Sequence, residues 1–354
     1  MKRLLTDHKD ITRTTLEDVP PARLEEGQAR LKLESFALTA NNVTYAAVGF
    51  QTGYWKFFPT GMDGQGLVPV WGVAEVVESR SDALNPGTRL YGFYPLAEEL
   101  VITPQADAQG MIVDAAPHRA ELPAVYNRYS PVQPAPQRQE DLRALLQPLL
   151  ATSYLLCDWL IDNDFFGAEQ VIVGSASSKT GLGLCKFLAE PDTPRKHIVG
   201  LTSQGNVPFV ERASGCDQVL AYDRAEEIER RPSVFIDMAG NGRVKQAVHA
   251  RLGEALKHSA AVGLSHWDKF EAGQTLEGVK PQFFFAPAQI AKRREEWGPG
   301  VMEKRVSHAW KRLAENAADW IDLRSHHGLS EAAEVYDSLA QGRANPRDGH
   351  IIRL

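Results

Sequence analysis

The sequence predicts an α/β protein in which a doubly wound parallel sheet accompanies a second, β-rich domain. Three observations lead to this fold class. The middle third of the chain alternates continuous apolar runs with helix-like segments, the first third contains short strands punctuated by glycine and proline, and a last apolar strand closes the chain. Because 354 residues are too many for one ordinary core, we expect two domains.

The parallel sheet is predicted from five apolar, β-branched runs in the middle third, at 170–174, 197–201, 218–221, 233–237 and 259–263. Helix-like segments fill the intervals between these runs. This alternation is typical of βαβ units, and strands that are apolar throughout are typical of a sheet buried on both faces. We therefore predict a doubly wound, nucleotide-binding domain over residues 140–268.

The β-rich domain is predicted from the chain on either side of that sheet. Residues 29–36 (ARLKLESF) alternate with period two, and residues 85–95 (NPGTRLYGFYP) join a turn to another strand. Residues 104–140 are rich in proline, alanine and glutamine and predict a long loop. The charge run AKRREEW (291–297) predicts a solvated helix face. A final helix and strand would return to the first domain, which we expect to comprise residues 1–139 and 269–354.

Composition excludes several function classes. The net charge is −6 and no polybasic block occurs, which argues against nucleic acid or an anionic membrane as partner. The apolar stretch 144–161 is interrupted by polar residues and a proline, so we expect a buried helix rather than a membrane span. Three separate cysteines and the absence of metal-ligand motifs predict no metal site, and no leader segment is recognised, so the reducing cytoplasm is expected.

The stretch VIVGSASSKTGLG (171–183) carries the main functional signal. A strand that enters a turn of small residues and then a helix presents free N–H groups and a positive dipole end, which is a site for a dinucleotide diphosphate. The usual spacing of three glycines is broken here, so a plain strand–turn–helix is the alternative. A serine nucleophile is disfavoured because the sequence G-x-S-x-G is absent.

The loop after the second strand predicts the cofactor. NAD binding usually requires an acidic residue there, whereas residues 201–206 (LTSQGN) contain none and place Ser203 at this point. A small hydroxylated residue leaves room for a 2′-phosphate, which favours NADP(H). Lys179 would then supply the cation that this loop lacks, unless it is only a surface lysine.

Along nearly its whole length the chain resembles the medium-chain dehydrogenase/reductase superfamily, on its zinc-free, quinone-oxidoreductase-like side. ARLKLESFALTANNVTYAAVG resembles the family's early strand and loop, and LLATSYLLCDWL resembles the helix before its first nucleotide-domain strand. GCDQVLAYD, FIDMAGN and the terminal GHIIRL resemble later motifs. The resemblance implies a Rossmann domain, a GroES-like substrate domain and a homodimer, and the departures from the motifs fit a divergent branch of unknown function.

The resemblance also implies the cofactor site. Thr152 matches a threonine that faces the nicotinamide, Tyr222 matches a tyrosine beside the 2′-phosphate, and Ser178-Lys179 replace two glycines of the phosphate loop. Together with the loop after the second strand, these matches give the expected cofactor-binding residues Thr152, Ser175, Ser177, Ser178, Lys179, Thr180, Gly181, Ser203, Tyr222, Gly240 and Gly263.

On the substrate side, Tyr45 matches the tyrosine of the family's NxxDxY loop, although the aspartate is missing. Hydrogen-bond donors Tyr45, Asn41 or Asn42 would hold the oxygen of an apolar or aromatic carbonyl compound while hydride passes from NADPH to an activated C=C bond or a quinone, without zinc. The alternatives are a non-catalytic NADPH-binding sensor or scaffold, or a carbonyl reductase on the same fold. Aromatic residues that would form the substrate pocket, or else pack in the core, are Tyr54, Trp55, Phe57 and Phe58.

Overall fold

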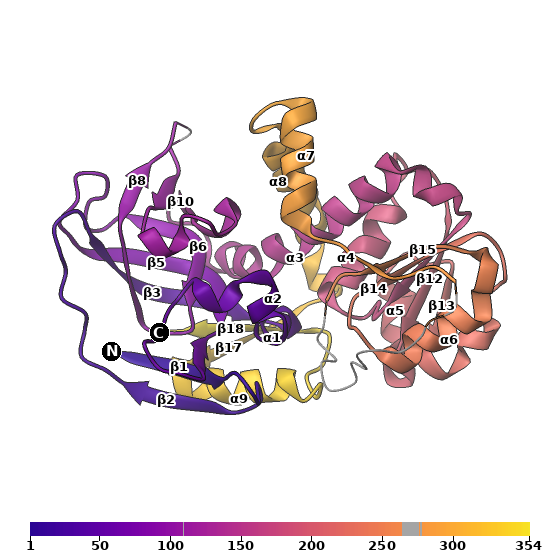
Figure 1. Cartoon of the computed structure of the whole chain (residues 1–354), viewed down its shortest axis with the longest axis horizontal. Coiled ribbons are helices and arrows are strands. Elements are labelled where there is room, and N and C mark those ends of the chain that lie inside the picture. The colour runs from indigo at the N-terminus through magenta and orange to yellow at the C-terminus, as the bar shows by residue number, and fades with distance from the viewer. Residues whose placement is uncertain (109, 264–275, 277) are drawn as a thin grey trace. The chain divides into compact units, whose positions relative to one another are not determined.

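The structure is a computed structural model that describes residues 1–108, 110–263, 276 and 278–354 (Figure 1). The chain divides into two compact units. Unit 1 comprises Met1–Leu145 and Ile321–Leu354, and unit 2 comprises Leu146–Trp320. The expected domain boundary at 139/140 stays a prediction, and the one at 268/269 lies outside the described residues.

Unit 2 is built on a parallel sheet. Its strands in the described residues are β11 (Gln170–Gly174), β12 (His197–Thr202), β13 (Gln218–Ala221), β14 (Ser233–Asp237), β15 (Leu256–Ala261) and β16 (Gln282–Phe283). They lie in the order β13-β12-β11-β14-β15-β16, and every pair is parallel. This is the doubly wound order, in which the chain turns from β13 back to β14, so the strand order reverses at the carboxyl ends of β11 and β14. The predicted fold class is confirmed.

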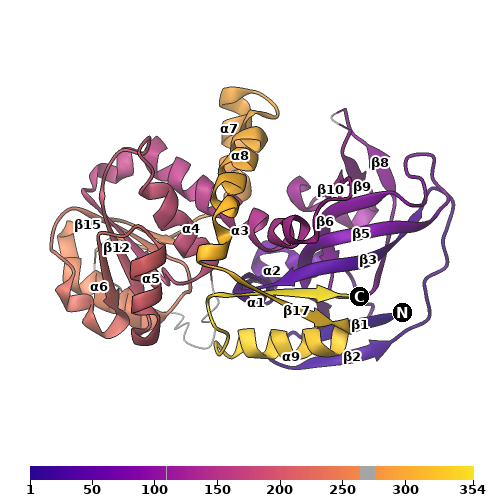
Figure 2. The ribbon, with the colours of Figure 1, turned by 180° about the vertical axis from the view of Figure 1, so that it is seen from behind.

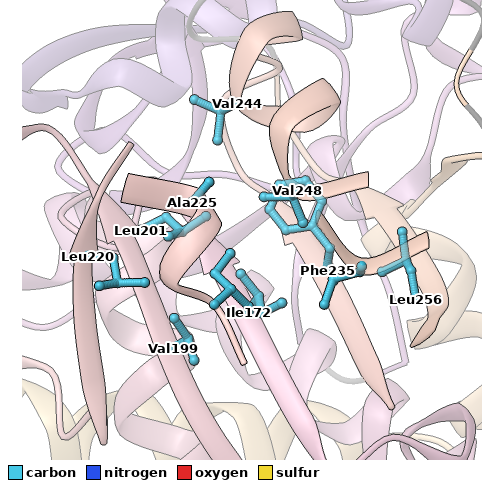
Figure 3. Packing of buried hydrophobic residues seen from close by; sticks show 11 residues of the cluster. Ile172, Val199, Leu201, Leu220, Ala225, Phe235, Val244, Val248 and Leu256 are labelled. Atoms are coloured by element: carbon cyan, nitrogen blue, oxygen red, sulfur yellow. The ribbon is translucent and has the colours of Figure 1, made fainter. Parts of the chain in front are cut away.

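Helices cover this sheet and close its core. The helices are α4 (Lys179–Leu188), α5 (Val207–Ala213) and α6 (Gly242–Leu252). Val248 of α6 packs against Ile172 of β11 and Phe235 of β14, and all three side chains are fully buried (Figure 3). Apolar side chains from neighbouring parallel strands therefore form one continuous layer beneath α6, as the continuous apolar runs predict.

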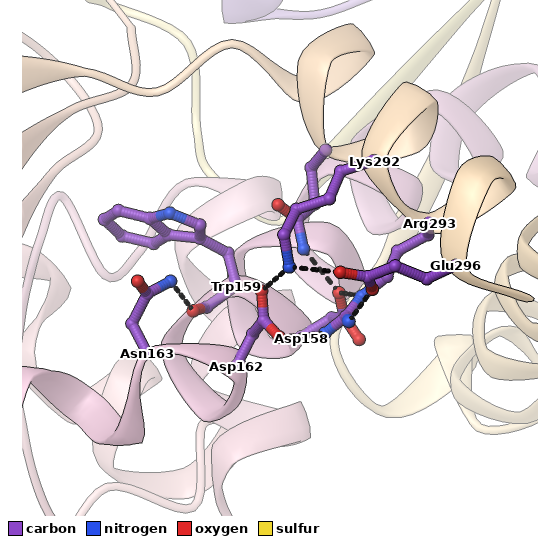
Figure 4. A network of polar contacts seen from close by, with 8 residues as sticks. Asp158, Trp159, Asp162, Asn163, Lys292, Arg293 and Glu296 are labelled. Atoms are coloured by element: carbon purple, nitrogen blue, oxygen red, sulfur yellow. Dashed lines mark hydrogen bonds and ion pairs between the residues drawn. The ribbon is translucent and has the colours of Figure 1, made fainter.

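A helical hairpin of α7 (Ala286–Trp297) and α8 (Val301–Glu315) is fastened to α3 (Gln137–Asp162) by charged side chains. Arg293 Nε lies 2.7 Å from Asp158 Oδ2 and its Nη2 lies 3.1 Å from Asp162 Oδ1, while Lys292 also pairs with Asp162 (Figure 4). Only 8% of the Arg293 side chain is exposed. The expectation that the charge run AKRREEW forms a solvated face is therefore wrong at Arg293, because the carboxylates of α3 compensate its burial.

Helix α3 covers the apolar stretch predicted as a buried helix. By length and composition alone it could cross a membrane, but 56% of its most apolar window is buried. Pro148 lies inside the helix, and Thr152 Oγ1 donates to the Pro148 carbonyl oxygen at 3.2 Å.

Unit 1 is organised around a sheet that runs β17-β18-β3-β5-β6-β10-β9-β8, with β7 paired to β3 (Figure 2). All of its pairs are antiparallel except β17 with β18, which is parallel. Its strands are β3 (Ala29–Leu38), β5 (Pro69–Ser79), β6 (Arg89–Pro95), β7 (Glu99–Ile102), β8 (Pro104–Ala106), β9 (Ile112–Asp114), β10 (Arg128–Pro131), β17 (Asp322–His327) and β18 (Asp348–Arg353). Strand β18 pairs with β3, so the C-terminal segment completes this sheet as predicted. The expected long loop over 104–140 is wrong, because β8, β9 and β10 extend the sheet there.

The remaining elements of unit 1 flank this sheet. A smaller sheet has the order β2-β1-β4. Two short helices, α1 and α2, follow β3, and α9 follows β17. These elements are β1 (Lys2–Asp7), β2 (Thr14–Asp18), β4 (Gln65–Leu67), α1 (Ala40–Ala47), α2 (Gly49–Thr52) and α9 (Gly328–Ala340).

Candidate functional site

The predicted phosphate loop joins β11 to α4 at the carboxyl edge of the unit 2 sheet. Ser175 takes a positive φ of 53°, and the N–H of Ala176 donates to the Leu201 carbonyl oxygen at 2.9 Å. Ser178 caps α4, because its Oγ accepts from the Gly181 N–H at 3.1 Å. The turn therefore aims the first turn of α4, which begins at Lys179, toward the edge of the sheet.

Gly181 fits this turn because a side chain would not. A Cβ at this position would lie 2.5 Å from the Ser175 carbonyl oxygen and 3.1 Å from Ala176 Cα, which are both backbone atoms. The loop thus keeps the close approach of turn and helix that the family's glycines provide, although the glycine spacing is broken. N–H groups of the first helical turn have no partners within the helix, so the arrangement can bind an anion.

Ser177 ties the phosphate loop to the second strand. Its Oγ accepts from Thr202 Oγ1 at 2.9 Å and from Asn206 Nδ2 at 3.4 Å, and the residue is 8% exposed. Ser203, the next residue after β12, is exposed. The structure therefore brings Ser177 and Ser203 to the same edge but leaves only Ser203 open to a ligand.

Tyr222 and Asp237 complete this edge. The Tyr222 hydroxyl hydrogen-bonds Ser175, and burial raises the pKa of Tyr222. Asp237 ends β14 directly beside Gly174, and its Oδ1 accepts from the N–H groups of Ala239 at 3.1 Å and Gly240 at 2.9 Å.

Asp237 Oδ2 is buried without a hydrogen bond to any described residue, and burial raises the pKa of this carboxyl. Sequence reasoning did not single Asp237 out, although its signal was present as an acid at the end of a predicted strand. Its position at the turn of the doubly wound order makes it a part of the site.

Three further predicted cofactor residues lie close to these elements in the chain. Thr180 offers its carbonyl oxygen to Ser153 Oγ of α3 at 2.7 Å, and Thr152 precedes that serine. Gly263 follows β15, where the Val262 N–H donates to the Asp237 carbonyl oxygen at 2.9 Å. Their roles toward a cofactor stay predictions.

In unit 1, Asn42 holds helix α1 in place. Its Oδ1 accepts from the Thr39 N–H at 2.8 Å, and its Nδ2 donates to the Pro69 carbonyl oxygen at 2.8 Å. Thr39 caps the helix in return. Both polar groups of a side chain that is 3% exposed are thereby used, so the local geometry assigns Asn42 to structure.

The other two predicted donors, Tyr45 and Asn41, are hydrogen-bonded to each other. The indole N–H of Trp71 donates to the Tyr45 hydroxyl oxygen at 3.2 Å, and Asn41 also hydrogen-bonds this hydroxyl. Burial raises the pKa of Tyr45 far above its ordinary value, so the phenol stays protonated. Trp71, which sequence reasoning missed, is half-buried in the strand run PVWGV.

The predicted aromatic pocket residues are buried together. Tyr54 lies 4.5 Å from Tyr45 between ring centroids, and its hydroxyl is 2.9 Å from that of Tyr126. Trp55 packs on His8. Phe57 and Phe58 are 0% and 4% exposed and line a cavity of about 230 Å³. Packing therefore accounts for Tyr54 and Trp55, whereas Phe57 and Phe58 also face an open space.

The sequence matches one family model, described as "Protein of unknown function (DUF2855)", over residues 36–345. The chain belongs to this family. This match fits the divergent branch that the sequence motifs indicate. Among curated proteins, none matches the sequence significantly.

Solved structures share the fold of this family member. CurA from Vibrio vulnificus in complex with NADPH has a TM-score of 0.68 and 13% identity, covering 100% of this chain and 99% of that one. A mutant enoyl thioester reductase from Candida tropicalis has a TM-score of 0.57 and 11% identity, covering 100% and 99%. A quinone oxidoreductase from Coxiella burnetii has a TM-score of 0.55 and 16% identity, also covering 100% and 99%. The family member therefore has the medium-chain dehydrogenase/reductase fold.

Proposed function

We propose that this protein is an NADPH-dependent oxidoreductase. The observation that carries the proposal is the phosphate loop at the carboxyl end of β11, placed where the doubly wound order reverses toward β14. Bound NADPH in the structurally similar CurA complex supports this cofactor.

The residues at this edge fit the cofactor. Gly181 allows the tight turn, the first turn of α4 offers N–H groups for the diphosphate, and the exposed Ser203 takes the place of the acid that would repel a 2′-phosphate. Tyr222 stands beside the same loop. We assign the diphosphate to residues 178–181, with Lys179 as an added charge, and the 2′-phosphate to the neighbourhood of Ser203 and Tyr222.

NADPH supplies a hydride when bound. The chain must supply a donor that polarises the substrate, and Tyr45 fits this role. Trp71 donates to the Tyr45 oxygen, and the hydrogen bond with Asn41 lowers the Tyr45 pKa, as a bond donated to this oxygen does. The Tyr45 O–H hydrogen is therefore left to point at another acceptor, such as a carbonyl oxygen. Its raised pKa makes Tyr45 a hydrogen-bond donor rather than a proton source, so the enolate that hydride addition leaves takes its proton from water. The Asn41 amide has two N–H groups, so it can hydrogen-bond Tyr45 and still offer a second donor. Asn42 holds α1, the helix that carries both residues.

The proposed substrate is an apolar or aromatic carbonyl compound with an activated C=C bond, or a quinone. Enoyl thioester reductase and quinone oxidoreductase among the structural neighbours support these classes. We propose that no zinc takes part. Over residues 1–108, 110–263, 276 and 278–354, no group of three or more metal-ligating side chains is arranged around one point. The expected cytoplasmic homodimer is part of the same proposal.

One observation favours a second candidate function. Tyr45 is only 5% exposed, and its hydroxyl oxygen is already bonded within unit 1. A protein that binds NADPH as a sensor or scaffold would need no exposed donor there. The two candidates differ in whether NADPH is consumed.

The test is a screen of NADPH and NADH oxidation with purified protein over quinones, enones, enoyl thioesters and simple ketones. The proposal predicts NADPH oxidation with an enone, enoyl thioester or quinone, and loss of the C=C bond from an enone product. Reduction of the carbonyl group with retention of the C=C bond would instead assign a carbonyl reductase. Tight NADPH binding without oxidation by any compound would assign the sensor.

A further inference from the structure

A serine of α3 is hydrogen-bonded to the helix that begins at the phosphate loop. Ser153 is completely buried, and its hydroxyl donates to the Thr180 carbonyl oxygen at 2.7 Å, with the Leu149 carbonyl oxygen at 3.1 Å. A serine inside a helix usually bonds back to the residue four positions earlier, which here is Leu149. The shorter bond instead leaves α3 and reaches the first turn of α4, so Ser153 connects the two helices.

The contact depends on a close approach of α3 and α4 at Gly183. A Cβ at this position would lie 2.5 Å from Leu150 Cδ2 and 2.7 Å from Ser153 Oγ, so a side chain there would push both residues of α3 away. Gly183 ends the stretch VIVGSASSKTGLG, and the proposed cofactor contacts do not use it. The missing side chain therefore allows Ser153 to reach the backbone of α4.

The bond to Thr180 acts on the cap of α4. The Thr180 carbonyl group and the Gly181 N–H belong to one planar peptide unit. At the other end of this unit, the Gly181 N–H donates to Ser178 Oγ at 3.1 Å. Hydrogen bonds at both ends of a peptide group polarise and strengthen one another. Ser153 therefore fixes the peptide unit that holds the Ser178 side chain.

The Ser178 hydroxyl is in turn suited to a phosphate. A hydroxyl has one donor hydrogen and two acceptor lone pairs, and the Gly181 N–H occupies a lone pair rather than the hydrogen. Ser178 is half-buried at the edge of the sheet where the diphosphate is proposed to bind. Because a phosphate oxygen is a strong acceptor, a hydroxyl held in this orientation can donate to it.

We propose that Ser153 is a positioning residue of the phosphate site. It acts through the peptide unit of Thr180 and Gly181 on the Ser178 hydroxyl, which donates to the cofactor diphosphate. Because NADPH binding at this edge is itself the proposed function, the role of Ser153 depends on it. The diphosphate is common to NADPH and NADH, so Ser153 supports both cofactors equally and does not affect the preference between them.

The test is a fluorescence titration of the purified full-length protein with NADPH and with NADH. Ser153→Ala should weaken the binding of both cofactors by the same factor, about fivefold, because the donor to the diphosphate loses its support. Ser233→Ala is the matched control. Ser233 is also completely buried and donates to the Arg231 carbonyl oxygen at 2.6 Å, but it begins β14 at the opposite edge of the same sheet. This control should leave both affinities unchanged.

A double variant separates positioning from a general loss of stability. Ser178→Ala removes the hydroxyl that meets the diphosphate and should weaken binding about tenfold. If Ser153 acts through Ser178, adding Ser153→Ala to this variant should weaken binding by less than about twofold more. Gly183→Ala displaces the Ser153 side chain and should weaken both cofactors as Ser153→Ala does, which keeps the test valid if Ser153→Ala does not fold.

Failure of this role and failure of the proposed function give different results. A wild-type protein that binds neither cofactor would overturn both. Where the wild type binds NADPH, unchanged affinity in Ser153→Ala or in Gly183→Ala would overturn the role of Ser153 alone. The same holds for a loss confined to NADPH, for an equal loss in Ser233→Ala, and for losses that multiply in the double variant.

Discussion

The two units present their candidate residues in opposite ways. In unit 2 the site is made mainly of backbone at the edge of a regular sheet, and Ser203 stands exposed beside it. In unit 1 the candidate side chains Tyr45 and Asn42 are buried, 5% and 3% exposed, and each is hydrogen-bonded within the unit. Nucleotide binding can therefore be inferred from strand order and one loop, whereas the chemistry of unit 1 depends on side-chain packing that only the structure shows.

The largest effect is expected from the loss of Arg293, whose buried side chain holds the hairpin of unit 2 to α3. Arg293→Ala leaves Asp158 and Asp162 of α3 without a buried cation, so the free energy of unfolding of unit 2 should fall by about 3 kcal/mol. Chemical denaturation followed by tryptophan fluorescence measures it. Arg294→Ala, whose partner Glu303 is exposed, is the matched control and should change stability by less than about 0.5 kcal/mol. Equal effects of the two variants would mean that the buried network does not anchor the hairpin.

In unit 1, Tyr45→Phe tests whether the buried hydroxyl takes part in the reaction. If the hydroxyl polarises the substrate, kcat should fall about 100-fold while NADPH affinity stays the same. Because burial raises the pKa of Tyr45, the wild-type rate should show no loss from phenol ionisation as the pH rises to the ordinary tyrosine value near 10. Steady-state kinetics across pH measure both effects. A variant with the wild-type kcat would remove Tyr45 from the proposed mechanism.

Gly181→Ala tests whether the backbone geometry of the phosphate loop matters. The added Cβ would meet the Ser175 carbonyl oxygen at 2.5 Å, so the turn must shift, at a cost of about 1–3 kcal/mol in stability and with weaker NADPH binding. Gly205→Ala, where a Cβ meets nothing within 4 Å, is the control on the same edge of the sheet. Denaturation and NADPH titration of both variants decide the matter, and matching behaviour would refute the close-approach role of Gly181.

Lys179→Ala should have the smallest effect. If Lys179 supports the phosphates, NADPH binding should weaken about tenfold and rising salt should erode the wild-type advantage. A contact with the 2′-phosphate would leave NADH binding unchanged, whereas a contact with the diphosphate would weaken both cofactors. Lys257→Ala, an exposed lysine of β15, serves as the control. If Lys179→Ala binds both cofactors like the wild type at every salt concentration, Lys179 does not contact the phosphates.

The sequence predicts regular strands well and side-chain contacts between distant residues poorly. The alternation of apolar runs suffices for the sheet of unit 2, because parallel strands are buried on both faces and read alike. The burial of Arg293 could not be read from AKRREEW, because its partners Asp158 and Asp162 lie more than a hundred residues earlier in α3.

In unit 1 the sequence contains a signal for the structural role of Asn42 but none for the three short strands β8, β9 and β10. Asn42 stands three residues after Thr39, which is the spacing of a capping pair and points to structure. The strands β8, β9 and β10 are three or four residues long in a proline-rich segment, and their pairing with neighbouring strands and the buried Asp114–Arg119 pair become apparent only in the fold.

The central claim is that the carboxyl edge of the unit 2 sheet binds NADPH, and a fluorescence titration of the full-length protein with NADPH and NADH tests it most directly. The account predicts saturable NADPH binding in the micromolar range, about tenfold tighter than NADH, because Ser203 replaces the acid that NAD requires. No saturable binding of NADPH, or NADH binding that is equal or tighter, would contradict the account.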